Sequence, residues 1–283
     1  MISIGLAGWG DHDLIYAPGL RQQEKLKTYS RYFSIVEVDS SYYAILKEET
    51  YARWVAETSP RFSFVIKAFQ GMTGQNRVTY SEDDMATLFA RFKQSISPVL
   101  QANRCKAVLL QYPPWFDCTR EHVAELRKAR RRMGEIPVAL EFRHQSWFAE
   151  GMRDKTLSFM KSEQWIHSIC DEPQVYPGSV PTVLEPTDER LTIIRFHGRN
   201  AAGWTSGGAP NWREVRYLYR YSHEELLEWK ANLEALAGRT GEIGVIFNNN
   251  SGGDAAANAL QLMELLGAES KPLPPKQTDL FGD

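Results

Sequence analysis

Polar and ionisable side chains end nearly every short apolar run of this 283-residue chain. In chain order they are Glu37, Asp39, Lys67, Gln111, Glu141, Arg143, Asp171, Arg195, His197, Asn248 and Asn249. Three pairs of them stand two residues apart, and side chains at that spacing in a strand point to the same face. Unpaired charge inside a protein is costly, so these groups must pair with one another, with water or with a ligand.

These residue types suit acid–base chemistry on an anion. Arginine presents a planar fork that matches phosphate or carboxylate, and the cations that could hold such a group are Lys67, Arg143, Arg195 and His197. We predict Glu37, Glu141 and His197 as catalytic residues, with the carboxylates serving as general acid and base. The pattern indicates a hydrolase or lyase, although paired carboxylates near tryptophans also suit a glycosidase. A closed network of ion pairs that only specifies the fold is the structural alternative.

Tryptophans also follow several apolar runs, where an indole can stack on a base or a sugar or can plug the space under a loop. They are Trp9, Trp115, Trp147, Trp204 and Trp212. The ligand-binding residues that we predict are Trp9, Asp39, Lys67, Gln111, Arg143, Trp147, Asp171, Arg195 and Asn248.

A metal centre has less support from the residue types. Zinc prefers His and Cys ligands, but His197 is the histidine placed at the end of an apolar run, and the three cysteines are too far apart for a CxxC pair. The carboxylates could bind a magnesium or manganese ion, so a divalent cation stays an alternative. We predict no intrinsic metal and no cofactor.

The elements that must position these groups are short β-rich runs alternating with helical patterns. The predicted strands are Ile2–Ala7, Ile35–Val38, Phe62–Lys67, Ala107–Gln111, Val138–Glu141, Trp165–Cys170, Leu191–His197 and Gly244–Phe247. The predicted helices are Gln22–Tyr32, Glu48–Glu57, Glu82–Ile96, Arg120–Arg132, Gly151–Ser162, His223–Leu236 and Asp254–Leu266. Such alternation requires parallel pairing, and eight units close a TIM-like (β/α)8 barrel whose active site lies at the carboxyl ends of the strands. A doubly wound open sheet ranks second, because Gly5-Leu6-Ala7-Gly8 is not the expected glycine-rich turn.

Two segments depart from the repeat, and both follow strands. Prolines between Asp171 and Arg190 break any helix, so a Pro-rich loop should replace the sixth helix. The segment from Gly198 to Tyr221 should form a long loop over the mouth. We expect a single barrel domain over residues 1–267 and a Pro-rich flexible tail over residues 268–283.

Composition and charge limit the kinds of binding partner that we expect. The formal net charge is −2, so no global basic field indicates nucleic-acid binding, although Arg127–Arg132 carries a local basic run. We expect a small anionic ligand, with DNA as an alternative partner. The chain begins without the basic and long apolar regions of a signal peptide, and no apolar run approaches the roughly 18 residues of a membrane helix. We therefore expect a cytoplasmic protein with no membrane partner.

The end of the tail resembles the peptide by which bacterial proteins bind the sliding clamp. In such a peptide a glutamine anchors by hydrogen bonds, and a Leu-Phe pair fills an apolar cleft; here these residues are Gln277, Leu280 and Phe281. The resemblance implies a non-catalytic, nucleic-acid-associated module as the second function. The alternative is that Leu280 and Phe281 pack on the barrel.

Taken together and in order, the strand-end motifs resemble those of the YecE-like family, a domain of unknown function (number 72). The motifs are Gly8-Trp9, Glu37-Val38-Asp39-Ser40-Ser41-Tyr42-Tyr43, Val65-Ile66-Lys67, Leu110-Gln111-Tyr112-Pro113-Pro114, Glu141-Phe142-Arg143-His144-Gln145-Ser146-Trp147, Asp171-Glu172-Pro173, Arg195-Phe196-His197-Gly198 and Phe247-Asn248-Asn249. The resemblance implies an α/β barrel and no particular reaction. A structural likeness to the endonuclease IV barrel implies DNA binding, but this chain lacks that enzyme's histidine-rich zinc cluster. Asp39 stands where the family usually has Asn, and Ala7 where it often has Ser.

Overall fold

Eight parallel strands form a closed barrel in the computed structural model, which describes residues 1–283 except 177, 206–214, 269–270 and 275–283. The strands pair in chain order, and β8 closes on β1. Their bounds are β1 Ile2–Ala7, β2 Ile35–Val38, β3 Ser63–Lys67, β4 Cys105–Gln111, β5 Val138–Glu141, β6 Ile166–Asp171, β7 Leu191–Phe196 and β8 Glu242–Phe247. The predicted (β/α)8 barrel is confirmed, and only strand ends move by one or two residues.

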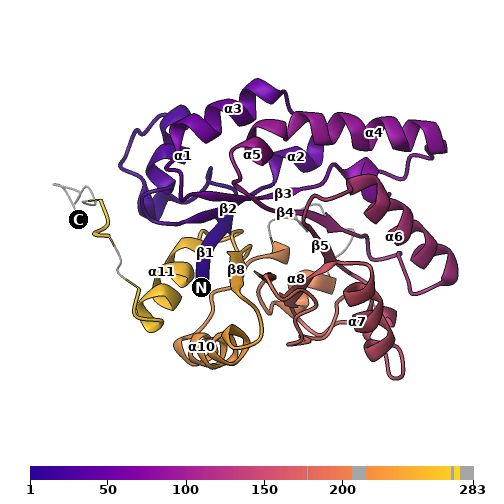
Figure 1. The fold of residues 1–283 in the computed structure, drawn as a ribbon. Coiled ribbons are helices and arrows are strands. Elements are labelled where there is room, and N and C mark those ends of the chain that lie inside the picture. Colours follow the sequence, from indigo (N-terminus) through magenta and orange to yellow (C-terminus); the bar gives the residue numbers. More distant parts are fainter. Residues whose placement is uncertain (177, 206–214, 269–270, 275–283) are drawn as a thin grey trace.

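Helices surround the strands (Figure 1). Those that the sequence predicted are α1 Gln22–Tyr29, α3 Glu48–Glu57, α4 Glu82–Ser95, α6 Arg120–Met133, α7 Arg153–Ser162, α10 His223–Ala237 and α11 Ala255–Leu265. Shorter pieces were not predicted: α2 Ser40–Tyr43, α5 Ser97–Gln101, α8 Ala201–Thr205 and the 3-10 helices η1 Asp13–Ile15, η2 Gln70–Thr73 and η3 Gln145–Phe148. Short helices lack the apolar periodicity by which longer ones are found.

Capping side chains mark the start of two of the long helices. The Thr119 side chain accepts a hydrogen bond from the backbone N–H of His122 at the start of α6. Ser222 and Glu225 form a reciprocal capping box at the start of α10. Both caps satisfy N–H groups that have no partner inside the helix, and so they decide where the chain leaves the strand-end loops.

Alternate residues of each strand point into the barrel. The apolar interior layers form one buried cluster of Ile35, Val65, Ala107, Leu109, Ala139, Ile166, Leu191, Ile193 and Ile246, and the partly buried Ala7 packs against it. The residues between them face the helices and form the larger core. The same parity, continued toward the carboxyl ends, brings polar residues from several strands into the barrel above the apolar layers.

The two irregular segments lie where the repeat predicted them. Within the described part of residues 172–190 there is no helix, so a loop does replace the sixth helix. The segment after β7 contains α8 and then residues 206–214, which lie outside the described residues. The clamp-like residues Gln277, Leu280 and Phe281 also lie outside the described part. Among the helices that are described, none has the length and apolar character needed to cross a membrane.

Candidate ligand site at the barrel mouth

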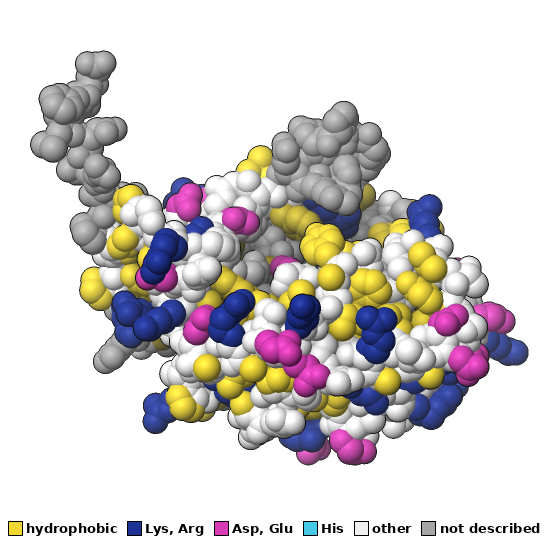
Figure 2. Space-filling model, turned by 90° about the horizontal axis from the view of Figure 1, so that it is seen from above, with side chains coloured by type: hydrophobic (Ala, Val, Ile, Leu, Met, Phe, Trp, Pro, Cys, Tyr) yellow, Lys and Arg dark blue, Asp and Glu magenta, His cyan; other side chains and the backbone are white. Residues whose placement is uncertain are grey.

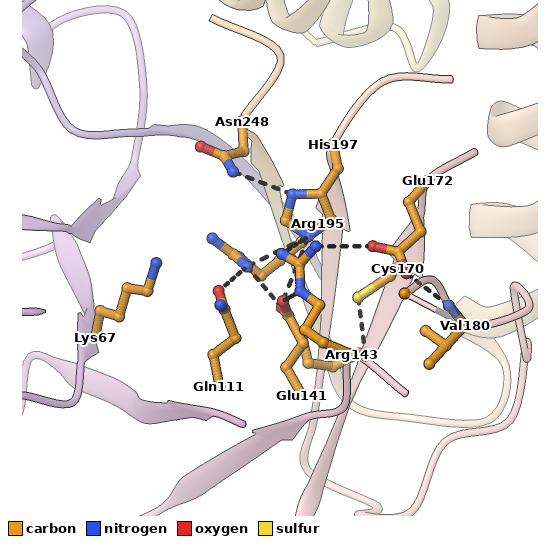
Figure 3. Close-up of polar contacts among 12 residues, drawn as sticks. Lys67, Gln111, Glu141, Arg143, Cys170, Glu172, Val180, Arg195, His197 and Asn248 are labelled. Carbon is orange, nitrogen blue, oxygen red and sulfur yellow. Dashed lines mark hydrogen bonds and ion pairs between the residues drawn. The ribbon is translucent and has the colours of Figure 1, made fainter. Parts of the chain in front are cut away.

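Arg195, on β7, lies at the centre of the polar layer. Its Nε and Nη2 donate to the two carboxylate oxygens of Glu37 on β2, at 2.8 and 2.6 Å. Its Nη1 donates to Glu141 Oε2 on β5 at 2.6 Å and lies 3.4 Å from Gln111 Oε1 on β4. One guanidinium thus connects β7 with β2, β4 and β5 across the interior of the closed barrel. Figure 3 shows its contacts with Gln111 and Glu141.

Arg143, just beyond β5, extends this network toward β6 and β7. Its Nε donates to Glu141 Oε1 at 2.7 Å, its Nη1 to Glu172 Oε2 at 3.0 Å and its Nη2 to His197 Nε2 at 3.0 Å. The Glu172 carboxylate also accepts the backbone N–H of Val180 at 2.7 Å. We call these six connected side chains the closed cluster: Glu37, Glu141, Arg143, Glu172, Arg195 and His197.

The closed cluster is sealed from solvent. Its six residues are only 0–3% exposed. Two aromatic side chains from the segment after β7 lie over it: the Trp204 ring is 5.4 Å from the Arg143 guanidinium and 6.2 Å from the His197 ring, and the Tyr217 ring is 5.8 Å from His197. The predicted charged groups therefore converge, but at this point of the mouth they face one another rather than water.

Burial and pairing shift the pKa values of the three carboxyl groups in different directions. Burial raises the pKa of Glu37 to about 7, because it outweighs the attraction of Arg195. Burial raises the pKa of Glu172 to about 7 against the attraction of Arg143. For Glu141 burial also opposes ionisation, but both guanidiniums together hold its pKa well below 4.5. Glu141 is thus the permanent anion, whereas the other two carboxyl groups titrate near neutrality.

His197 is neutral in this environment. Burial, and then the charges of Arg143 and Arg195, lower its pKa well below 6.5. Both guanidiniums donate toward Nε2, so this nitrogen accepts. The other ring nitrogen, Nδ1, lies 3.1 Å from the side-chain nitrogen of Asn248. The imidazole therefore acts as an acceptor between two arginines.

The other part of the mouth is partly exposed. We call Asp39, Lys67, Gln111 and Asn248 the open half, since each is partly accessible to solvent. Lys67 Nζ lies 3.7 Å from Asp39 Oδ1, with 15% of the lysine and 35% of the aspartate side chain exposed. It also lies 4.8 Å from the ring centre of Tyr42. In Figure 3 Lys67 stands apart from the arginines, with Gln111 between them.

Three residues that the sequence predicted to bind a ligand do not lie with the closed cluster or the open half. Asp171 points to the outer face of β6, where it accepts hydrogen bonds from Arg199 Nη2 at 2.7 Å and from the Trp229 indole. Trp147 is buried, stacks on a phenylalanine ring and donates to a backbone carbonyl. Trp9 packs edge-on against Trp54 of α3 at 4.9 Å. Aromatic side chains next to a barrel fill the space under the helices, and strand parity sends Asp171 outward.

Sequence reasoning missed Glu172, although it expected the segment that contains Trp204 to lie over the mouth. The β6 strand places Ser168 and Cys170 inside the barrel, so the same alternation points to Glu172 and not to its neighbour Asp171. That signal was present in the sequence, since Glu172 directly follows the predicted polar residue. No sequence pattern showed that Trp204, whose exposed fraction is 8%, lies over Arg143.

Among the described residues, one group could hold a metal ion. Glu141, Cys170 and His197 each offer one ligand atom, and these atoms lie within 4.8 Å of one another. The nitrogen that His197 would offer already accepts from Arg143 at 3.0 Å. The two guanidiniums therefore supply positive charge at the place where an ion would bind, and the donors as arranged do not fit a bound metal.

Three residues of the basic run on α6 are paired with acidic side chains. Arg127 Nε lies 2.8 Å from Glu163 Oε1, and Lys128 and Arg132 both pair with Glu82. On the face shown in Figure 2, Lys and Arg side chains are scattered among Asp and Glu rather than gathered in one patch. This helix is thus a mixed-charge surface on the outside of the barrel.

Comparisons with known proteins give a family but no reaction. The family model described as "Protein of unknown function DUF72" matches residues 3–279. The chain is 54% identical over 282 residues to UPF0759 protein YunF of Bacillus subtilis, covering 99% of this chain and 100% of that protein. It is 31% identical over 158 residues to UPF0759 protein YecE of Escherichia coli, covering 56% of this chain and 54% of that protein.

Solved structures agree with the fold. A DUF72 family protein from Enterococcus faecalis superposes with a TM-score of 0.88 at 37% identity, covering 99% of this chain and 100% of that one. A DUF72 family protein from Thermotoga maritima gives a TM-score of 0.81 at 30% identity, covering 94% and 99%. A D-psicose 3-epimerase, at 10% identity and a TM-score of 0.54, is similar in fold alone.

Proposed function

Because the chain belongs to the DUF72 family, which brings no known reaction with it, we propose a function from the geometry of the barrel mouth: the protein binds a small phosphate-bearing ligand over the open half. A nucleotide or a sugar phosphate is the expected class. The observation that carries the proposal is the loose pairing of Lys67. Its ion pair with Asp39 measures 3.7 Å and is partly exposed, whereas the ion pairs of Arg195 measure 2.6 Å and are buried.

The arginines support the ligand site without binding the ligand directly. The donors of Arg195 are directed at Glu37 and Glu141, and those of Arg143 at Glu141, Glu172 and His197. A phosphate that replaced these carboxylates would leave buried charges unpaired, which costs several kcal/mol. A phosphate at Lys67 would compete only with the long, partly exposed ion pair to Asp39. The side-chain amides of Gln111 and Asn248 would supply neutral hydrogen bonds beside the ammonium group.

Glu37 connects the two parts of the mouth and is the proposed proton carrier. It is held by Arg195 in the closed cluster, and its pKa also responds to Asp39 and Lys67 in the open half. With a pKa of about 7, this carboxyl group holds a proton for part of the time at neutral pH. An anion bound at Lys67 would raise that pKa further, so ligand binding should be accompanied by proton uptake at Glu37.

The ligand test compares two lysines at opposite ends of the barrel. Thermal stability is measured with inorganic phosphate, ribose 5-phosphate and AMP, and with ribose and adenosine as uncharged counterparts. We expect the phosphorylated compounds to raise the thermal stability of the wild type. The same compounds should leave the thermal stability of Lys67→Met unchanged. The stabilisation should persist in Lys106→Met, because Lys106 pairs with Glu242 at 2.7 Å at the amino-terminal end of the strands. Equal loss in both variants, or no effect of any phosphate on the wild type, would reject the proposal.

The proton test uses the ligand that stabilises most. Calorimetric titrations at pH 7 in two buffers of different ionisation enthalpy report the protons taken up on binding. The wild type should take up a fraction of a proton, and Glu37→Gln should take up none while still binding. Unchanged uptake in Glu37→Gln would remove Glu37 from the proposal but leave the anion site in place.

The clamp-recruited, nucleic-acid-associated module stays a prediction. Three basic residues of α6 are already paired with acidic side chains: Arg127 with Glu163, and Lys128 and Arg132 with Glu82. Large non-specific DNA affinity needs several unpaired cations on one face.

A further inference from the structure

A cavity of about 380 Å³ lies outside the barrel, between the helices α4 and α6 that stand side by side in Figure 1. This volume falls in the range of roughly 300–1,000 Å³ that is usual for small-molecule sites. Tyr112, the residue after β4, lines the cavity. Because Gln111 points into the barrel mouth, its neighbour Tyr112 points to the outer face of the strand. No residue of the open half is among the described residues that line this cavity, so it is a separate site.

The hydroxyl of Tyr112 has no hydrogen-bond partner in the part of the chain that the structure describes. The residue is only 3% exposed. Burial raises the pKa of Tyr112, the charge of Glu125 raises it further, and the charge of Arg132 lowers it. Both of these charged residues also line the cavity, so the hydroxyl is directed at its charged wall. A buried hydroxyl costs free energy unless water or a ligand satisfies it, which makes this phenol an anchor for a ligand.

The charged wall of the cavity offers groups of both signs. Glu125, Lys128 and Arg132 stand on one face of α6, at the spacing of successive helical turns. Lys128 and Arg132 both pair with Glu82 of α4, so that group carries one surplus positive charge. The Glu82 side chain is 66% exposed, and exposed ion pairs contribute little to stability, so a ligand carboxylate can take its place on Arg132. Glu125 forms no ion pair with a described residue, and the four charges sum to zero, which suits a zwitterion.

The other wall of the cavity is the end of a stack of aromatic rings. Phe142 and Trp147 stack at 4.1 Å, and Trp147 and Phe116 at 5.8 Å. Phe116 in turn lies 4.2 Å from the Tyr112 ring and 4.1 Å from the His122 ring. Phe116, Tyr112 and His122 line the cavity, so the stack runs from the buried side of the loop to the cavity wall. A planar ring in the cavity would extend this stack.

We propose that this cavity is a second ligand site and that it binds an aromatic amino acid. The carboxylate of the ligand accepts from Arg132 and from the Tyr112 hydroxyl, which are charge-assisted hydrogen bonds. Its ammonium group pairs with Glu125, and its ring packs on the aromatic wall beside Trp115, whose exposed fraction is 50%. The site shares no residue with the proposed phosphate site, so each of the two proposals can fail without the other.

The first experiment removes one group of the ligand at a time. Calorimetric titrations of the full chain use phenylalanine and tryptophan, together with 3-phenylpropionate, phenethylamine and alanine, which lack the ammonium group, the carboxylate and the ring respectively. We expect the wild type to bind phenylalanine or tryptophan at least about tenfold more tightly than each of the three partial ligands. Equal affinity for phenylalanine and phenethylamine would remove the carboxylate contact and reject the proposal, and so would the absence of binding of both amino acids at millimolar concentrations.

The second experiment changes the protein and places the ligand in the cavity. Tyr112→Phe keeps the stacked ring and removes only the hydroxyl, and it should weaken phenylalanine binding about tenfold. Arg132→Met should weaken it at least as much. Arg131→Met is the matched control, because this neighbouring arginine is exposed and does not line the cavity. Its affinity for phenylalanine should equal that of the wild type, as should the affinity of Lys67→Met.

Two results of this experiment would overturn the proposal. Unchanged phenylalanine binding in both Tyr112→Phe and Arg132→Met would place the ligand elsewhere. An equal loss in Arg131→Met and Arg132→Met would show a general effect of charge on the helix and no defined carboxylate contact. Circular dichroism checks the fold of each variant, and Tyr112→Phe decides the matter if Arg132→Met does not fold.

Discussion

The closed cluster and the open half lie at the same end of the barrel, yet they balance their charges in different ways. In the closed cluster, buried arginines and carboxylates contact one another at 2.6–3.0 Å. In the open half, Lys67 and Asp39 stand 3.7 Å apart and reach solvent. Both parts look alike in sequence, as charged residues at strand ends. The difference shows that the pairing of a cation, more than its residue type, decides whether it is available to a ligand.

The largest effect should come from breaking the closed cluster at its centre. Arg195→Ala leaves Glu37 and Glu141 buried without their shared partner. Removal of one partner from a buried ion pair costs about 3–5 kcal/mol, and we expect a loss of that size in the free energy of unfolding measured by urea denaturation. The double variant Arg195→Met/Glu37→Leu should lose less than the sum of its single variants, because fewer charges stay unpaired. A loss below about 1 kcal/mol would show that the cluster is not sealed.

The second effect is a pH dependence that only the closed cluster should show. The pKa of Glu37 is raised from 4.5 to about 7 in the folded protein, so the folded state holds its proton more tightly than the unfolded chain. The bound proton of Glu37 therefore adds its full contribution to the free energy of unfolding below pH 4.5, and this contribution is lost as the pH rises to about 7.

The measurement compares unfolding free energies of the wild type and Glu37→Gln between pH 4.5 and 8. The wild type should lose stability relative to the variant as the pH rises, by on the order of 1–3 kcal/mol. Asp39→Asn is the matched control from the open half and should leave the pH dependence of the wild type nearly unchanged. A difference between wild type and Glu37→Gln that stays constant with pH would contradict the raised pKa.

The smallest effect should come from the open half. Lys67→Met breaks an ion pair that is long and partly exposed, so the free energy of unfolding should change by less than about 1 kcal/mol. The same substitution should abolish stabilisation by phosphate. A destabilisation as large as that of Arg195→Ala would mean that Lys67 belongs to the structural network, and the contrast between the two parts of the mouth would disappear.

Much of the candidate site could be predicted because strand parity is a local property. Glu37, Glu141 and Arg195 follow from alternation along predicted strands, and parallel closure brings their carboxyl ends together. Asp171 was predicted in the site because it directly follows the predicted strand, whereas the alternation of Ser168 and Cys170 points to Glu172. The structural alternative of a closed ion-pair network also describes the arginines better than an open anion site does.

The sequence by itself determined the alternation of strands and helices, the eightfold closure and which side chains enter the barrel. Those properties depend on apolar periodicity, prolines and helix caps, which act between near neighbours in the chain. Only the tertiary structure decided that Arg143 faces three acceptors, that Trp204 covers it and that Lys67 stays accessible. Each of these depends on side chains from different strands and loops meeting in space, and the distance between them has no counterpart in the order of the residues.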